Sequence, residues 1–247
     1  GTFVKKNEEK GISILHEAAT LVNSSDRLLK LVEIILSKQS FDVRSADNNS
    51  VYFPLAKKYC KEAADLGNTK AMVLYGKLCM KEKKSKHFEI NSDFKEAFKY
   101  FRQAADNGDG EGLAFCGRFL ECGYGIDKPN KKDAFDYYKA SFDKRDMTGY
   151  AFYGSALIEG VDGGAPINEG EGIRLIKISC DHQNPYGMAN YGYFLSKGIS
   201  RLKKNESQSL YYYKMAAEAG CPVAFSNLGV CYRERKGIEK DVKLAAK

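Results

Sequence analysis

The sequence predicts an all-α fold, a right-handed α/α solenoid of about five helix-turn-helix repeats that follows one further helical unit. Two observations carry this prediction: glycines that recur inside apolar runs, and helix-capping residues that recur in step with them. A third observation agrees, because no stretch shows the alternation of apolar and polar residues that is typical of half-buried strands. With 43% hydrophobic residues, the chain can bury a continuous core.

The first observation is a glycine that returns at the spacing of a repeat. The segments 63–67, 104–108 and 216–220 share a small-residue motif that ends in Gly, and each is followed nine residues later by another glycine. Since a glycine inside a helix costs about 1 kcal/mol relative to Ala, its recurrence predicts close packing between helices. Two degenerate copies keep the frame, and the five glycines lie 41, 37, 38 and 37 residues apart: Gly76, Gly117, Gly154, Gly192 and Gly229.

The second observation is a helix N-cap at the start of each repeat. An Asp or Asn recurs every 36 to 38 residues, just before a stretch of helical periodicity. In three of the first four copies Glu or Gln follows three residues later, which is the capping-box pattern, and the other copy has Asp there. The predicted caps are Asp93, Asn130, Asn168, Asn205 and Asp241.

After each cap the pattern predicts a first helix, a turn and a second helix. In one copy Ala97, Phe101 and Ala104 share one face, as in an amphipathic helix. Past the turn, the apolar run 112–120 ends before Gly123, as expected of a buried helix with a C-terminal glycine. The frame predicts a helical unit at 1–50 and repeats at about 51–92, 93–129, 130–167, 168–204 and 205–240, with the start of a sixth at 241–247.

These repeats resemble the Sel-one-like repeat family, a relative of the tetratricopeptide repeat. Residues 102–108 (RQAADNG) are similar to the end of the family's first helix, 228–232 (LGVCY) to the core of its second, and 123–127 (GYGID) to its glycine loop. The resemblance covers about residues 52–247 and implies a scaffold or adaptor that assembles protein complexes.

Two copies depart from the motif at the turn between their helices. Residues 141–145 (SFDKR) and 179–183 (SCDHQ) replace the small-residue segment and its final glycine. The angle between the two helices of these copies is therefore left open by the sequence.

The N-terminal segment resembles the opening of an ankyrin repeat. A Leu-His pair at Leu15 and His16 stands where the first ankyrin helix starts, and the apolar run 31–36 and the segment 41–49 continue the likeness. The spacing between the two helices is about five residues too long for that repeat. Two alternatives stay open for residues 1–50: an ankyrin-like helix pair, or a divergent helix pair that caps the solenoid.

Composition and charge limit the class of protein. Seven cysteines at irregular positions do not form the framework of a secreted disulfide scaffold, which favours a cytoplasmic or nuclear location. No window approaches the 18 consecutive apolar residues of a membrane span, so no membrane partner is expected. The net charge of +7 favours acidic partners in general and does not choose between nucleic acid and protein.

No group of residues points to an enzyme, a cofactor or a metal. His16, His87 and His182 lie in three different units, so no histidine has a nucleophile and a carboxylate near it in the sequence. Cys116 and Cys122 are spaced outside the range of zinc ligands and have no second pair. We therefore predict a non-catalytic chain.

One basic position in each repeat suggests a surface for a partner. The position of Arg102 is basic in all five copies. If the first helices line the inner, concave surface, as the resemblance implies, one cation per repeat would follow an acidic peptide or domain. The alternative is that these basic residues only keep the surface of the helices in contact with water and bind no partner. The candidate partner-binding residues are Lys58, Lys61, Lys99, Arg102, Lys139, Arg174, Lys177 and Lys214.

The predicted function is a protein-interaction adaptor that binds its partner on the concave surface of the first helices. The first alternative is an architectural spacer within a longer solenoid, with self-association through the unfinished helix at 241–247. Nucleic-acid binding is a weaker alternative, since the tyrosines that could stack on bases fall beside the packing face. A ligand pocket near residues 45–60 is weaker still, because only Asp42, Asp47 and Cys60 would serve it.

Overall fold

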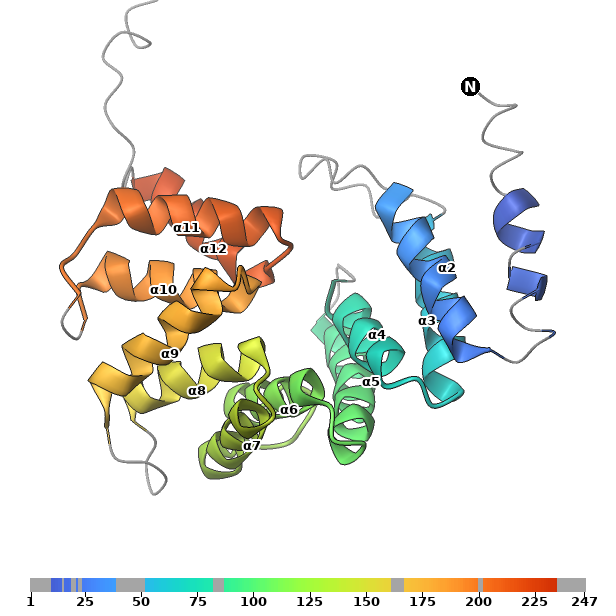
Figure 1. The fold of residues 1–247 in the computed structure, drawn as a ribbon, viewed down its shortest axis with the longest axis horizontal. Coiled ribbons are helices and arrows are strands. Elements are labelled where there is room, and N and C mark those ends of the chain that lie inside the picture. The colour runs from blue at the N-terminus through green and yellow to red at the C-terminus, as the bar shows by residue number, and fades with distance from the viewer. Residues whose placement is uncertain are drawn as a thin grey trace, which may run out of the picture. The chain divides into compact units, whose positions relative to one another are not determined.

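The computed structural model describes residues 10–14, 16–18, 21, 24–38, 52–81, 87–160, 167–199 and 202–234. Within these residues every regular element is a helix, as the repeat pattern predicts, and consecutive helices fold back on one another (Figure 1). The chain divides into two compact units, Gly1–Pro129 and Asn130–Lys247. None of the described helices is both long enough and apolar enough to span a bilayer.

Unit 1 contains two helix pairs of the predicted kind. They follow a short helical stretch within residues 10–18 and the helix α2 (Ser25–Lys38). The predicted hairpin at 41–49 lies outside the described residues. Each helix packs on the next one along the chain from α2 to α6. The pairs are α3 (Tyr52–Asp65) with α4 (Thr69–Lys81), and α5 (His87–Asp106) with α6 (Gly110–Cys122).

Unit 2 contains three further pairs, so the described residues hold one pair for each predicted repeat glycine. Each first helix packs on its own second helix, and each second helix packs on the first helix of the next pair. The pairs are α7 (Lys131–Asp143) with α8 (Met147–Glu159), α9 (Glu169–Asp181) with α10 (Pro185–Lys197), and α11 (Glu206–Glu218) with α12 (Pro222–Glu234).

Three of the predicted N-caps are confirmed and one is wrong. The side-chain oxygens of Asn130, Asn168 and Asn205 accept hydrogen bonds of 3.0 to 3.2 Å from the backbone N–H three residues on. Asp93 is not a cap, because α5 begins six residues earlier, at His87. The segment before Asp93 contains no Pro or Gly that would stop the helix from extending backwards. Asp241 lies outside the described residues.

A second set of caps, which we did not predict, starts the second helices. The carboxylate of Asp109 accepts from the N–H of Gly112 at 2.8 Å. Asp146 and Asn184 each accept from two backbone N–H groups, at 2.9 to 3.1 Å. Asn68 accepts from the N–H of Ala71 at 2.9 Å. In the repeats of α7 with α8 and of α9 with α10, both helices therefore begin at an Asp or Asn side chain.

The two degenerate turns have the same geometry as the glycine turns. Gly108 has a φ of 79°, and Arg145 and Gln183, at the same position in the next two repeats, have φ values of 59° and 56°. The N–H of Arg145 donates to the carbonyl of Phe142, and the next N–H donates to the carbonyl of Ser141, as in a Schellman motif. The angle that the sequence left open is therefore set by the same turn in every described repeat.

The predicted close approach at the repeat glycines is confirmed at Gly76, Gly154 and Gly192. A Cβ added to Gly154 would lie 2.7 Å from the carbonyl oxygen of Gly172 on α9. One added to Gly76 would lie 2.7 Å from the Phe101 ring, and one added to Gly192 would lie 3.1 Å from the Tyr213 ring. At Gly229 no atom lies within 4 Å. Each of the first three glycines faces the first helix of the following pair.

A second glycine position brings the two helices of one pair together. Added Cβ atoms at Gly149 and Gly187 would each lie 2.3 Å from the hydroxyl oxygen of a buried serine, Ser141 or Ser179, on the preceding helix. Apart from these serines, Thr148 and Ser209, the buried residues are hydrophobic or glycine, and Ala97, Phe101 and Ala104 are fully buried, as predicted. The small residues of the repeat motif therefore mark the places where helix backbones meet.

The concave layer of first helices stays a prediction, and in unit 2 the helix contacts favour the other layer. There the second helices α8 and α10 pack directly against each other, while the first helices α7, α9 and α11 do not approach one another as closely. The side-chain amide of Asn190 on α10 donates to the carbonyl of Ala151 at 3.2 Å and to Ser155 Oγ at 2.9 Å, both on α8. Because α8 and α10 are the more closely packed set, we take the second helices as the inner layer of unit 2.

Candidate partner-binding surfaces

The four predicted binding cations of unit 1 lie on α3 and α5. Three of them contact other side chains of the same unit. Lys61 Nζ contacts Glu96 Oε1 at 2.7 Å and so joins the two first helices. Lys58 lies 4.0 Å from Glu62, and Lys99 lies over the ring of Tyr100. Arg102 is exposed and makes no hydrogen bond or ion pair with the described chain.

The contact between Lys61 and Glu96 is part of a polar network over the buried ring of Tyr75. Burial alone would raise the pKa of Glu96, but hydrogen bonds from Lys61 and Tyr75 and the charge of Lys61 lower it. The same hydrogen bond raises the pKa of Lys61. Tyr100 donates to Asp65 at 2.5 Å in the same space between α3 and α5. These side chains hold two repeats together, which is a structural role.

The predicted binding cations of unit 2 lie on α7, α9 and α11. Arg174 is held by two hydrogen bonds, of 2.6 and 2.7 Å, to Glu171 on its own helix. Lys139, Lys177 and Lys214 are exposed, and no hydrogen bond or ion pair engages them in the described residues. They extend the row of Arg102, one residue per repeat.

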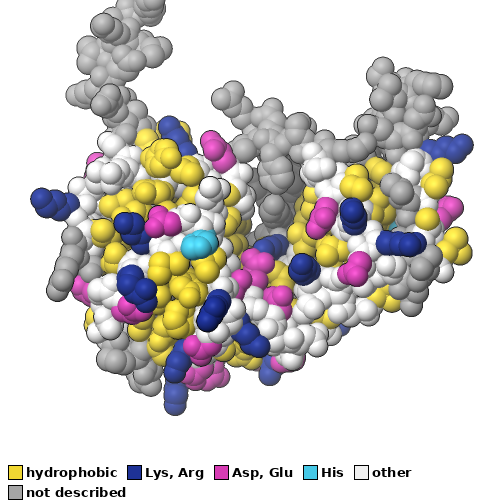
Figure 2. All heavy atoms as spheres, viewed as in Figure 1, with side chains coloured by type: hydrophobic (Ala, Val, Ile, Leu, Met, Phe, Trp, Pro, Cys, Tyr) yellow, Lys and Arg dark blue, Asp and Glu magenta, His cyan; other side chains and the backbone are white. Residues whose placement is uncertain are grey.

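An acidic residue accompanies every cation of this row. Four residues after each of the five basic positions comes an Asp or Glu, a spacing that places both charges on the same side of a helix. On the face shown in Figure 2, Lys and Arg side chains are likewise interspersed with Asp and Glu and form no single basic patch. The acids are Asp65, Asp106, Asp143, Asp181 and Glu218.

A different surface is formed by the inner layer of unit 2. We use "inner face" for five exposed or half-buried residues at two equivalent positions of α8, α10 and α12, and no charged residue is among them. Tyr193 and Val230 stand 37 residues apart at one position, and Tyr186 and Val223 stand 37 residues apart at the other. The inner face consists of Ser155, Tyr186, Tyr193, Val223 and Val230.

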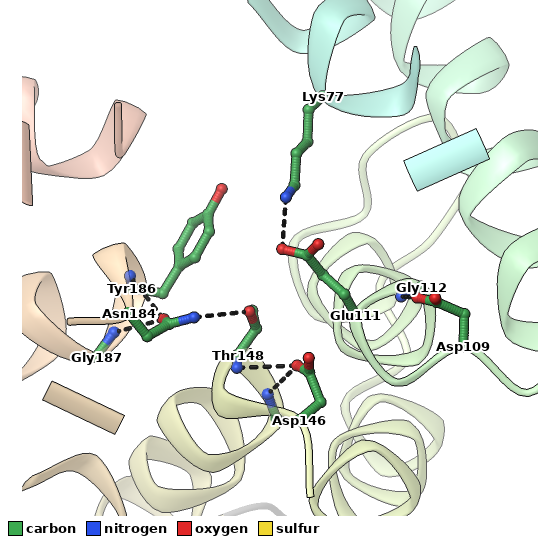
Figure 3. A network of polar contacts seen from close by, with 10 residues as sticks. Lys77, Asp109, Glu111, Gly112, Asp146, Thr148, Asn184, Tyr186 and Gly187 are labelled. Atoms are coloured by element: carbon green, nitrogen blue, oxygen red, sulfur yellow. Dashed lines mark hydrogen bonds and ion pairs between the residues drawn. The ribbon is translucent and has the colours of Figure 1, made fainter. Parts of the chain in front are cut away.

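The caps of the second helices hold the start of the inner face in place. Asn184 donates from its amide nitrogen to Thr148 Oγ1 on α8 at 3.1 Å, and its oxygen accepts from the backbone N–H of Tyr186 (Figure 3). Asp146 in turn accepts from the N–H of Thr148. Two consecutive caps and one hydroxyl thus fix α10 against α8, with the Tyr186 ring projecting from the start of α10 (Figure 3).

The equivalent positions of unit 1 carry charges. Lys77 on α4 pairs with Glu111 on α6 at 2.5 Å, and Arg118 pairs with Glu121 within α6 at 2.6 Å. At these two positions the second helices therefore carry charged side chains in unit 1 and uncharged side chains in unit 2, although Lys197 lies over the Tyr193 ring and Arg233 pairs with Glu234 elsewhere on α10 and α12. The sequence contains this contrast, but it becomes visible only when the second helices are aligned and the layer they form is known.

The other residues with reactive side chains have structural surroundings. His16 Nε2 lies 2.7 Å from Glu62 and its ring stacks on Tyr59, while His182 Nδ1 lies 2.8 Å from the carbonyl oxygen of Ile178. Of His87 only the backbone position in α5 is described. Among the described residues no group of His, Cys, Asp and Glu has the arrangement of a metal site.

The cysteines of the described repeats are free, and most of them are buried. Burial raises the pKa of the Cys60 and Cys116 thiols to about 12, and that of the Cys180 thiol to about 11. A thiol with such a pKa is protonated at neutral pH and is therefore a poor nucleophile and a poor metal ligand. These cysteines act as small core residues.

Comparison with known families now identifies the repeats. The model of the Sel1 repeat matches residues 1–23, 53–68, 69–109, 110–146, 185–221 and 224–247, which is more than half of the chain. The chain belongs to the Sel1 repeat family. Sel1 repeat proteins are in general non-catalytic scaffolds for protein–protein interaction. The match to 1–23 favours a divergent Sel1 repeat over an ankyrin-like one in that segment.

The chain is similar to solved Sel1 repeat structures, and one of them reaches a TM-score that indicates the same fold. A sel1 repeat protein from Klebsiella pneumoniae has a TM-score of 0.50 at 13% identity, over 87% of this chain and 96% of its own. A Sel1 repeat protein from Oxalobacter formigenes has a TM-score of 0.44 at 25% identity, over 78% of this chain and 73% of its own.

A protective antigen of uropathogenic Escherichia coli with an SLR fold has a TM-score of 0.45 at 18% identity, over 90% of this chain and 52% of its own. No curated protein matches the chain. The likeness to solved structures therefore concerns the architecture, and the partner has to be inferred from the surfaces of this chain.

Proposed function

We propose that this Sel1 repeat chain is a non-catalytic adaptor that binds a protein partner on the inner face of unit 2. The observation that carries the proposal is the row of uncharged side chains that crosses three successive second helices. Tyr193 and Val230 are each 36% exposed, and Val223 is 40% exposed, although all three are apolar or aromatic. Aromatic and aliphatic side chains of this kind anchor partners at interface centres.

The uncharged side chains of the inner face favour a partner segment with apolar side chains. A segment with apolar side chains could contact Tyr186, Tyr193 and Val230 at once, because equivalent positions repeat from helix to helix. Binding through such contacts depends little on ionic strength, since no ion pair is required.

The test compares the native chain with a double variant, Tyr193→Ala with Val230→Ser, as bait for proteins from a lysate of the source organism. Both residues are exposed, so the variant should fold with an unchanged circular-dichroism spectrum. We expect partners that bind at both 0.1 and 0.5 M salt to be lost from the variant. Partners retained by the variant at native levels would place binding elsewhere and contradict the proposal.

The basic row is a second candidate surface, for an acidic peptide or domain. One exposed cation in each of the three repeats of unit 2, Lys139, Lys177 and Lys214, supports it. The five accompanying acids weaken the attraction, because they reduce the net potential along the row. Charge reversal to Glu at Arg102, Lys139 and Lys177 tests this surface, and a partner of the row should be lost both from this variant and at high salt.

A chain that captures nothing in either form would support the spacer alternative instead. For the location, we propose the cytoplasm or the nucleus, where free thiols such as the seven of this chain persist.

A further inference from the structure

The exposed charges on the first helices of unit 2 form two columns of opposite sign. At one position of α7, α9 and α11 stands an exposed Lys, and four residues later stands an exposed Asp or Glu. Four residues of helix span about 6 Å along the helix axis, so the two columns run side by side across the three helices. We use "paired columns" for these six residues, Lys139, Asp143, Lys177, Asp181, Lys214 and Glu218.

The charges of the paired columns do not pair with one another within the chain. In the part of unit 2 that the structure describes, no hydrogen bond or ion pair engages any of the six side chains. The Lys stands N-terminal to the acid, which is the weaker of the two orders for a pair within one helix. In unit 1, by contrast, the equivalent Lys61 pairs with Glu96 at 2.7 Å, and Asp65 accepts a hydrogen bond from Tyr100. The charges that join first helices in unit 1 are therefore unpaired in unit 2.

The paired columns of one copy are complementary to those of a second copy. A half-turn about a line between the columns, across the three helices, places every Lys of one copy over the acid of the same repeat in the other. Each repeat then supplies two ion pairs, since Lys177 of either copy faces Asp181 of the other. Such an interface is isologous and has two-fold symmetry, which is the commonest symmetry of soluble oligomers.

We propose that the paired columns are the contact surface between two copies of this chain, which form a symmetric dimer held by ion pairs. The acids that weaken the basic row for an acidic partner are what a second copy requires, because opposite charges then meet at all six positions. The proposal is independent of the proposed function, since the inner face lies on α8, α10 and α12 and shares no residue with the paired columns. A dimer and a partner on the inner face therefore do not compete for the same side chains.

Sedimentation velocity of the full chain tests whether the dimer forms. At about 0.1 mM protein we expect the sedimentation coefficient of a dimer at about 0.05 M salt and that of a monomer at about 0.5 M salt, because salt screens exposed ion pairs. A chain that is monomeric at the lower salt concentration overturns the proposal. A dimer that persists unchanged at the higher concentration also overturns it, since ion pairs would not hold such a dimer together.

Two charge variants identify the surface. The first makes both columns acidic by Lys139→Glu, Lys177→Glu and Lys214→Glu. The second makes both columns basic by Asp143→Lys, Asp181→Lys and Glu218→Lys. Each variant alone should be monomeric at low salt, because like charges then face one another, whereas an equimolar mixture should form a dimer. A dimer of either variant alone, or a mixture that stays monomeric although both variants keep the native circular-dichroism spectrum, places the contact elsewhere and overturns the proposal.

A charge swap on α9, the central helix of the three, tests the pairing with fewer changes. Lys177→Asp alone should weaken the dimer, and adding Asp181→Lys should restore it, because each new charge then faces its opposite in the second copy. Lys203→Glu is the control, since Lys203 is exposed outside the paired columns and its reversal should leave the dimer intact. A swap that fails to restore the dimer, or a control that weakens it as much as Lys177→Asp, overturns the proposal. None of these results depends on whether a partner binds the inner face.

Discussion

At the scale of single residues, the positions that decide the geometry of each repeat are the left-handed residues of the turns. Arg145 and Gln183 hold φ values near +60° that glycine holds in the other turns. A left-handed conformation costs a residue with a side chain about 1 kcal/mol. The turn persists in these repeats because its backbone hydrogen bonds and the cap that follows it are intact.

This conformation leads to a prediction for Arg145→Gly. Glycine removes the left-handed strain at an exposed site, and we expect the free energy of unfolding to rise by about 0.5–1 kcal/mol after the entropy of the unfolded glycine is included. The control is Lys144→Gly, since Lys144 has a φ of −76° and gains nothing from glycine. Urea unfolding measures both, and equal effects of the two substitutions would contradict the account.

Where a glycine lets two helices approach closely, we predict that adding a methyl group lowers the free energy of unfolding. In Gly149→Ala the new Cβ would lie 2.3 Å from Ser141 Oγ and 2.7 Å from the backbone nitrogen of Phe142, so α7 and α8 must separate. We expect a loss of about 2–3 kcal/mol. Gly170→Ala, in the exposed first turn of α9 where the nearest atom is 4.0 Å away, should be neutral or stabilising by up to about 1 kcal/mol. Thermal unfolding of both variants measures these changes. A loss of stability at Gly149→Ala that is no larger than the change at Gly170→Ala would contradict the packing argument.

At the scale of elements, capping residues and helical periodicity were enough to predict most helices. They were not enough to predict how the helices pack into layers. Asn130, Asn168 and Asn205 could be predicted as caps because a cap depends on its own side chain and the N–H groups that follow it. Asp93 followed by Glu96 has the same pattern and is not a cap, because nothing in the preceding segment ends the helix. A capping signal is reliable only where the chain before it cannot continue the helix.

The layer that faces inward could not be predicted in this way. Both helices of a repeat carry an apolar face and small residues, so the sequence does not say which set crowds together. That choice depends on contacts such as Asn190 with Ala151, which join residues 39 positions apart. The predicted basic row was placed on the inner layer by resemblance, and in unit 2 it lies on the first helices, which pack less closely with one another than the second helices do.

The contact between α3 and α5 predicts how pH acts on one pair of elements. The pKa of Glu96 is lowered in the folded state, so the unfolded chain binds the proton more readily. The ionised form then stabilises the fold above the unfolded pKa, and this contribution is lost as the pH falls through the lowered value. Because Lys61 and Glu96 are partly exposed, we expect the contribution to be below about 1 kcal/mol.

The measurement is urea unfolding of the native chain and of Glu96→Gln at pH 7 and at pH 3. The two should differ more at pH 7 than at pH 3, because the charge contribution of Glu96 is lost as the pH falls towards its lowered pKa. Glu33→Gln, at an exposed position of α2, serves as the matched control and should differ little at either pH. A difference between native and Glu96→Gln chains that does not change with pH would show that lost packing, and not charge, is responsible.

At the scale of the whole molecule, buried thiols lie in both compact units, so their protonation and labelling can be used to follow the unfolding of each unit. Cys60 and Cys116 belong to unit 1 and Cys180 to unit 2, and all three have pKa values raised by burial to between about 11 and about 12. The reference thiol value is 9.0, so unfolding releases protons above that pH. The stabilisation is complete below pH 9 and is lost as the pH rises towards the folded values.

We therefore expect the urea midpoint to be steady between pH 7 and 8.5 and to fall between pH 9 and 11. At pH 8, labelling of these three thiols by a small alkylating reagent should require unfolding, because in the folded state they are both inaccessible and protonated. Mass spectrometry of chains labelled at increasing urea concentrations follows each thiol separately. Simultaneous labelling of Cys60, Cys116 and Cys180 would mean that the two units unfold together, and earlier labelling on one side would identify the less stable unit. Rapid labelling of all three without urea would contradict the buried positions from which the argument starts.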